Sequence, residues 1–114
     1  MKKENKNSLF SWTQHSQAKL LQYSLSENRV KRVIRHPWRI EEGIAPGTIA
    51  CLQRTGSKKH PYELWVMYVI KKPKIRVISA WKYPGVTEPG DPIPIPPDIF
   101  GEILADLQQE AKNN

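Results

Sequence analysis

The chain has 114 residues, of which 39% are hydrophobic and four are tryptophan, so it is long enough for one domain with its own core and too short for two. No apolar run approaches the roughly 20 residues that span a bilayer, and residues 1–8 lack the apolar stretch of a secretory signal, so we expect a cytoplasmic protein with no membrane partner. Cys51 is the only cysteine, which excludes an internal disulfide and a cysteine-rich zinc site.

Two helices are predicted near the start of the chain. Ser11 or Thr13 is suited to cap the first helix, which runs to about Tyr23. Ser26 is a good N-cap for the second helix. That helix should end before Pro37, because a proline disfavours the helical conformation of the residue before it.

Alternating and apolar runs then predict a sheet. The expected strands are 38–42, 48–54, 62–70 and 75–82. The third of these is apolar on both faces, which predicts a central position. A long basic hairpin loop is expected at 55–61, and strands joined by hairpins in sequence order favour a mostly antiparallel sheet.

The chain changes character after the last predicted strand. Six prolines within residues 84–97 predict an extended linker, and residues 98–111 then carry the apolar spacing of a helix. The predicted organisation is therefore a flexible basic arm at 1–10 and a single α+β domain at 11–83, with two helices packed on a four-stranded sheet. The linker and a terminal helix follow, and that helix is expected to pack on the domain or on a partner.

Positive charge is concentrated in the body of the chain. The residues up to Lys82 include 17 basic and 5 acidic side chains, whereas the remainder includes 1 basic and 6 acidic. A basic body attracts polyanions, of which nucleic acid is the commonest. The candidate nucleic-acid-binding residues are Arg29, Arg32, Arg39, Trp81, Lys82 and Tyr83. The alternatives are a solvated helix face for the arginines and an aromatic lid over the core for Trp81 and Tyr83.

A second candidate site lies on the first predicted helix, where His15 and Lys19 are four residues apart and share one face. Cleavage of RNA by transesterification needs a base, an acid and a cation, roles that histidine, lysine and arginine can fill without metal. The alternative is a partly buried histidine at the start of a helix, which the spacing alone favours. We expect no metal and no cofactor, because the three histidines are scattered and no phosphate-binding glycine loop is present.

Two runs in this region resemble a known family. They are W-T-x-H-x-x-A-K from Trp12 to Lys19 and Y-x-L-S-E-x-R-V-K-R-V-I-R-H-P from Tyr23 to Pro37. They are similar to the small uncharacterised domains related to BrnT-type toxins, within the RelE/ParE-like ribonuclease toxin superfamily, over about residues 12–83. The resemblance implies a metal-independent ribonuclease or a ribosome-directed toxin, with a possible cognate protein inhibitor. His15 would be its base, and Lys19, Arg35 and Arg76 its electrostatic residues.

The sequence departs from that family in two places. Those domains usually carry an arginine late in the first helix, suited to bind a phosphate, where this chain has Gln22 and Tyr23. The proline-rich segment and the terminal helix are additions, and their acidic charge makes them a candidate cover for the active face. The leading hypothesis is a toxin-like, RNA-directed domain, either a ribonuclease or a binder of RNA or the ribosome. The alternatives are a non-catalytic protein whose basic face binds an acidic protein partner, and a DNA-binding accessory factor.

Overall fold

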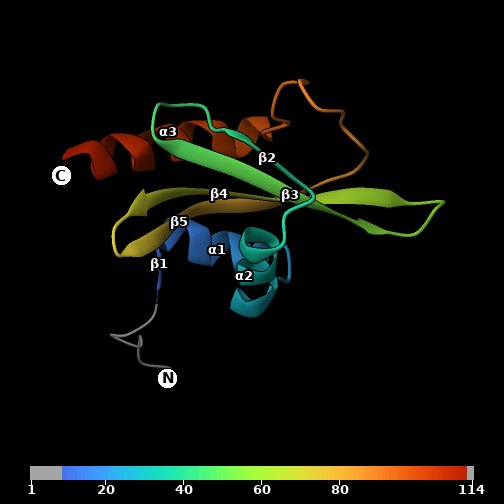
Figure 1. Cartoon of the computed structure of the whole chain (residues 1–114), viewed down its shortest axis with the longest axis horizontal. Coiled ribbons are helices and arrows are strands. Elements are labelled where there is room, and N and C mark those ends of the chain that lie inside the picture. The colour runs from blue at the N-terminus through green and yellow to red at the C-terminus, as the bar shows by residue number, and fades with distance from the viewer. Residues whose placement is uncertain (1–8, 113–114) are drawn as a thin grey trace.

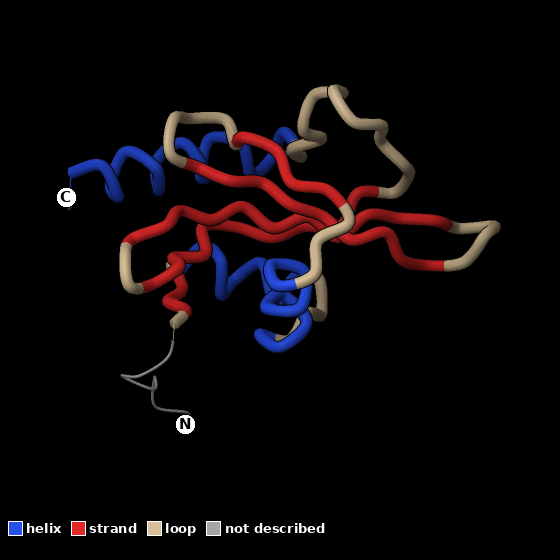
Figure 2. Tube along the Cα trace, viewed as in Figure 1, coloured by secondary structure: helices blue, strands red, loops and turns tan. Residues whose placement is uncertain are grey.

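A computed structural model describes residues 9–112 and shows an α+β fold in which one sheet lies between two helical layers (Figures 1 and 2). The five strands have the order β1-β5-β4-β3-β2. Helices α1 and α2 lie on one side of the sheet and α3 on the other (Figure 1). The elements are β1 (Phe10–Trp12), α1 (Gln14–Gln22), α2 (Glu27–Arg35), β2 (Arg39–Glu42), β3 (Thr48–Gly56), β4 (Pro61–Lys71), β5 (Lys74–Tyr83) and α3 (Pro97–Lys112).

The two predicted N-terminal helices are confirmed, together with their caps. The Thr13 side chain accepts a hydrogen bond from the Ser16 amide, and Ser26 accepts one from the Arg29 amide. These bonds satisfy amide groups that have no partner within the helix. Of the two proposed caps for α1, Thr13 is the one used, and Ser11 lies in β1.

The sheet is built around β4, as its two apolar faces predict. Its residues 63–69 are all buried, and it pairs antiparallel with β3 and β5. Alternation along the strands divides the interior into two cores. The α1–α2 core contains Phe10, Leu20, Val30, Val33, Cys51, Leu64, Val66, Tyr68, Val77 and Ala80. The α3 core contains Ala50, Leu52, Trp65, Met67, Val69, Ile78, Trp81, Ile99, Ile103 and Leu107.

The prediction of four strands was wrong by one strand. The additional strand, β1, pairs parallel with β5, with Phe10 opposite Ile75, and makes the sheet mixed. Phe10 had been assigned to the flexible arm, but it is only 3% exposed and belongs to the α1–α2 core. Ordered structure therefore begins before residue 11, and residues 1–8 of the predicted arm lie outside the described residues.

The β3–β4 hairpin is longer than predicted. Thr55 pairs with Tyr62 and Gly56 with Pro61, so the connecting loop is only 57–60. The hairpin extends beyond the layer of α1 and α2 (Figure 1). Its outer part therefore presents side chains that no helix covers.

Residues 84–96 contain no helix or strand, but they form a packed strap and not a free linker. The carboxylate of the fully buried Glu63 accepts hydrogen bonds from the amide and the hydroxyl of Thr87, both at 2.8 Å, and from the Trp65 indole at 3.0 Å. The Trp81 indole donates to the carbonyl of Pro94 at 3.0 Å. These bonds hold the strap against the sheet, since an unsatisfied buried carboxylate would be costly.

Helix α3 begins at Pro97, where a proline is favoured because its missing amide hydrogen would have no helical partner. It buries Ile99, Ile103 and Leu107 in the α3 core, whereas Phe100 and Leu104 are 42% and 38% exposed. The helix therefore packs on the sheet of its own chain. No helix among residues 9–112 combines the length and the apolar character needed to cross a membrane.

Burial of Cys51 gives a chemical prediction. The thiol is fully buried on β3, and this burial raises its pKa to about 12. Because the thiolate is the reactive form, Cys51 should not react with a thiol reagent such as dithionitrobenzoate at pH 8 while the protein is folded. Complete reaction is expected after unfolding in guanidinium. Rapid reaction of the folded protein would contradict this burial.

Candidate nucleic-acid interface

The six arginines divide into two groups by their ionic partners. Those outside α2 form ion pairs: Arg39 with Glu41, Arg54 with Glu63 and Glu88, and Arg76 with Glu110. The three arginines on α2 are Arg29, Arg32 and Arg35. Within residues 9–112, no carboxylate lies within 4.0 Å of these three or of Lys31 on the same helix. We call Arg29, Lys31, Arg32 and Arg35 the α2 basic face.

The α2 basic face is held on the sheet by specific contacts. Lys31 and Arg35 lie over the Phe10 ring, at 5.3 and 5.4 Å from its centroid. The amide of Gln53 on β3 donates to the carbonyl oxygens of Arg32 and His36 at 3.3 and 2.8 Å, and its oxygen accepts from Arg29. These contacts fix the position of the helix and leave Arg32 and Arg35 exposed to solvent.

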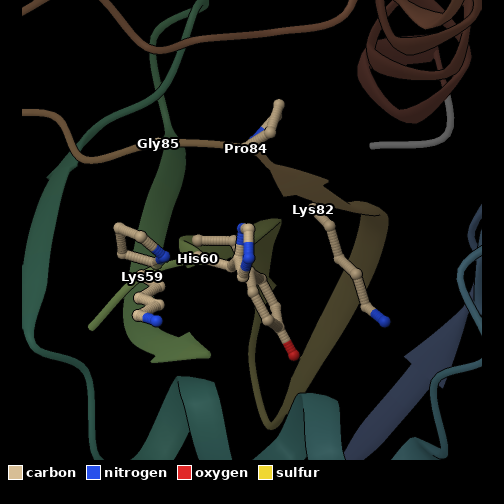
Figure 3. Close-up of a pocket in the computed structure, with 7 residues that line it drawn as sticks. Lys59, His60, Lys82, Pro84 and Gly85 are labelled. Carbon is tan, nitrogen blue, oxygen red and sulfur yellow. The ribbon is translucent and has the colours of Figure 1, made fainter. Parts of the chain in front are cut away.

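A groove opens beside the outer part of the β3–β4 hairpin, with a volume of about 630 Å³. One wall comes from the hairpin and the other from the end of β5 and the beginning of the strap (Figure 3). Its lining residues are Lys59, His60, Pro61, Tyr62, Lys82, Pro84 and Gly85. The lining contains two lysines and a histidine and no carboxylate, so the groove favours anions. We call it the hairpin groove.

The hairpin groove and the α2 basic face lie on the same side of the sheet. Side chains alternate along a strand, so Tyr62 shares a face with Leu64 of the α1–α2 core. Leu64 is the register partner of Gln53, which contacts Arg29. The groove is therefore about 7 Å along β4 from the residues that α2 covers.

A different cluster surrounds His15. Its Nε2 lies 3.0 Å from the hydroxyl oxygen of Ser79 on β5, and its Nδ1 lies beside a carboxylate oxygen of Glu102 on α3. A nucleophile, a base and an orienting carboxylate are arranged in this order in hydrolytic triads. Here, however, Ser79 is fully buried and the His15 side chain is only 7% exposed, so the cluster is closed to a macromolecular substrate.

Three carboxylates on α3 face this cluster and the neighbouring part of β5. Glu102, Asp106 and Glu110 are four residues apart, which places them on one side of the helix. Burial raises the pKa of Glu110, but hydrogen bonds and charge from Lys71 and Arg76, each at 2.9 Å, outweigh it and hold the pKa below its usual value. Burial, together with the two neighbouring carboxylates, raises the pKa of Asp106 although His15 and Arg76 oppose the shift.

The raised pKa of Asp106 predicts a pH-dependent effect on stability. A carboxyl group with a raised pKa in the folded state costs stability above that pKa and costs none below its unfolded value of 3.8. Asp106→Asn should therefore raise the melting temperature at pH 7, and the gain should disappear as the pH falls below 3.8. The exposed Glu42→Gln is the control and should change little. An equal gain at all pH values would show that the charge of Asp106 is not the cause.

The four predicted catalytic residues do not converge in one open site. His15 and Arg76 both contact α3, through Glu102 and Glu110. Lys19 is buried and donates to Gln22 at 2.7 Å. Arg35 lies on the α2 basic face against Phe10. The sequence did not point to Ser79, because a serine within a strand carries no signal until its neighbour across the fold is known.

The predicted nucleic-acid-binding residues are also separated by the structure. Arg29 and Arg32 lie on the α2 basic face, and Lys82 lines the hairpin groove. Arg39 is unsuited to this role, because its side chain is 8% exposed and its guanidinium bonds to Glu41 and Thr87. Trp81 is fully buried and stacks on Trp65 with centroids 6.1 Å apart, and Tyr83 packs against the α3 core, so the interpretation as an aromatic lid holds for both.

Tyr62 and Lys59 are groove residues that the sequence analysis missed. The signal available was the run TGSKKHP, which predicted a basic loop but not the aromatic ring beside it. Within the described part of the chain, no group of three or more histidine, cysteine or acidic side chains is placed to hold a metal ion. No protein-family model, no curated protein and no solved structure matches the chain.

Proposed function

We propose that the protein is a toxin-like, RNA-directed domain that binds RNA through the α2 basic face and the hairpin groove. The observation that carries the proposal is the division of the arginines. Three are neutralised by carboxylates, and the three on α2 have no carboxylate partner within residues 9–112. Unpaired arginines on one rigid helix suit the phosphates of a nucleic acid, which they contact in pairs of parallel hydrogen bonds.

The α2 basic face and the acidic side chains of α3 lie on different sides of the sheet. Helix α3, which carries Asp98, Glu102, Asp106 and Glu110, lies on the opposite side of the sheet from α2 (Figure 1). A polyanion is therefore attracted to the α2 side and repelled from the α3 side. The presence of Tyr62 in a basic groove favours single-stranded RNA over a duplex, because unstacked bases can lie on an aromatic ring.

Ribonuclease activity is the second candidate, because the Nε2 of His15 lies 3.0 Å from the Ser79 hydroxyl, but this cluster is buried and RNA could reach it only after α3 moved away. The test is induced expression of the wild type and of His15→Ala in a bacterial host, with growth and total RNA integrity followed together. Growth arrest with RNA cleavage, relieved by the substitution, would support a ribonuclease. Normal growth and intact RNA with both proteins would contradict ribonuclease activity and leave RNA binding as the only proposed function.

An acidic protein partner is distinguished from RNA by competition. The purified protein is bound to a labelled single-stranded RNA, and either unlabelled RNA or polyglutamate is added. Polyglutamate offers carboxylates without bases or a ribose 2′-hydroxyl. We expect unlabelled RNA to compete at far lower concentration than polyglutamate. Equal competition by the two would favour the interaction protein.

A further inference from the structure

The hairpin groove has a composition that suits one nucleotide. We propose that it is a subsite for a single nucleotide of a bound RNA strand, with the phosphate at Lys82, the base against Tyr62 and Lys59 on the opposite wall. This inference rests on the proposed RNA-binding function. The groove volume of about 630 Å³ lies within the range of about 300–1,000 Å³ that is typical of small-ligand sites.

The groove favours anions because Glu63, the acidic residue next to it in the sequence, points to the other face of the sheet. Glu63 is next to Tyr62 in sequence, but alternation turns it to the other face of β4. There its carboxylate is fully buried and bonded to Thr87 and Trp65. The ammonium groups of Lys59 and Lys82 form no ion pair with a carboxylate of residues 9–112. A phosphate entering the groove therefore meets no negative side chain.

Tyr62 provides the aromatic surface. The ammonium of Lys82 lies 5.5 Å from the centroid of its ring, within the range of a cation–π contact. Such a contact is weak at a surface, and a phosphate is a stronger partner for the ammonium. When a nucleotide enters, Lys82 can turn to the phosphate and leave the ring to the base. Stacking of a base on an aromatic side chain contributes about 1–3 kcal/mol in other single-strand sites.

The loop that carries Lys59 and His60 is fixed by its own hydrogen bonds. The amide of Ser57 donates to the His60 carbonyl at 3.3 Å, and the amide of His60 donates to the Ser57 hydroxyl at 3.0 Å. Gly56 has a φ of +85°, and a Cβ there would lie 2.4 Å from the His60 carbonyl oxygen and 2.8 Å from the Tyr62 ring. Only glycine fits this close turn, which sets the loop and the ring side by side.

The second wall of the groove is formed by backbone and by a rigid ring. Pro84 and Gly85 follow β5 and leave the sheet where Tyr62 would otherwise gain a partner (Figure 3). The ring of Pro84 has few conformations, so this part of the wall loses little entropy when a ligand binds. A Cβ at Gly85 would lie 3.1 Å from the Tyr83 ring, so a larger residue there would disturb the wall.

The experiment is a titration of the isotope-labelled full chain followed by amide resonances in NMR. The probes are 5′-AMP, adenosine, inorganic phosphate and a short single-stranded oligoadenylate. We expect AMP and the oligonucleotide to shift the amides of 57–62 and 82–85, and AMP to bind more tightly than adenosine or phosphate. Lys82→Ala should weaken AMP binding about tenfold. Lys72→Ala, in the β4–β5 turn at the opposite end of the sheet (Figure 1), is the matched control and should leave binding unchanged.

The outcomes separate this inference from the proposed function. If the oligonucleotide shifts only α2 amides and AMP shifts none in the groove, the subsite is wrong and RNA binding stands. If AMP binds no better than inorganic phosphate, the groove is an anion site and the nucleotide assignment is overturned. If AMP occupies the groove and the oligonucleotide does not bind at all, the ligand is a free nucleotide, and both the RNA subsite and the RNA-binding function fail.

Discussion

Replacing Arg29, Arg32 and Arg35 together by alanine is expected to weaken the binding of single-stranded RNA about 100-fold. Each arginine–phosphate contact contributes about 1 kcal/mol in the net, and three such contacts amount to about 3 kcal/mol if they are independent. The salt dependence should fall as well, by about 2 in the slope of log K against log salt, because each single-strand phosphate contributes about 0.7. Fluorescence anisotropy with a labelled oligonucleotide measures both quantities.

The matched control carries the same change in net charge at other positions. Lys72, Lys74 and Lys112 are also without ion pairs among residues 9–112, but they lie in the β4–β5 turn, at the start of β5 and at the end of α3. Their replacement by alanine should reduce affinity only slightly, through net charge. If the two triple variants weaken binding equally, the protein responds to its total charge, and the α2 basic face is not the docking surface.

Ile103→Ala is expected to lower the free energy of unfolding by about 2–5 kcal/mol, the range for removing a buried isoleucine side chain beyond its β-carbon. Ile103 is fully buried in the α3 core, where α3 packs on the sheet. Leu104 is the next residue on the same helix, is 38% exposed, and is absent from both cores. Leu104→Ala should therefore cost less than about 1 kcal/mol, since exposed substitutions have small effects.

Guanidinium unfolding of the full chain measures both variants. Because α3 also carries the carboxylates that contact His15, Arg76 and Lys71, loss of its packing should expose this cluster as well. Increased hydrogen exchange of α3 amides in Ile103→Ala would support this coupling. Equal losses of stability in Ile103→Ala and Leu104→Ala would contradict the packing of α3 on its own sheet.

The elements that could be predicted from the sequence are those fixed by local chemistry. Thr13 and Ser26 cap their helices with their own side chains, and Pro37 limits α2 through its effect on the preceding residue. The position of β4 followed from an apolar run on both faces. Strand β1 could not be predicted, because three residues carry too little pattern and its pairing with β5 depends on the fold.

The candidate site was only partly predictable, because burial depends on where distant segments lie. Arg29 and Arg32 could be predicted because they lie on a charged face of a helix. Trp81 and Arg39 are equally suitable residue types for binding nucleic acid, but the strap covers them. Ile78 is an extra residue in β5 where the register with β4 shifts between Met67 and Tyr68. Such a bulge changes which side chains share a face, so the contact between Ser79 and His15 could not be read from alternation.

The affinity of the wild-type protein for a single-stranded RNA, measured over a range of salt concentrations, tests the central claim most directly. Three arginines and a lysine on α2, with Lys59 and Lys82 in the groove, predict a steep linear decrease of log K with log salt, with a slope of about −4 at about 0.7 for each neutralised phosphate. Undetectable binding at low salt, or an affinity that does not change with salt, would contradict the account.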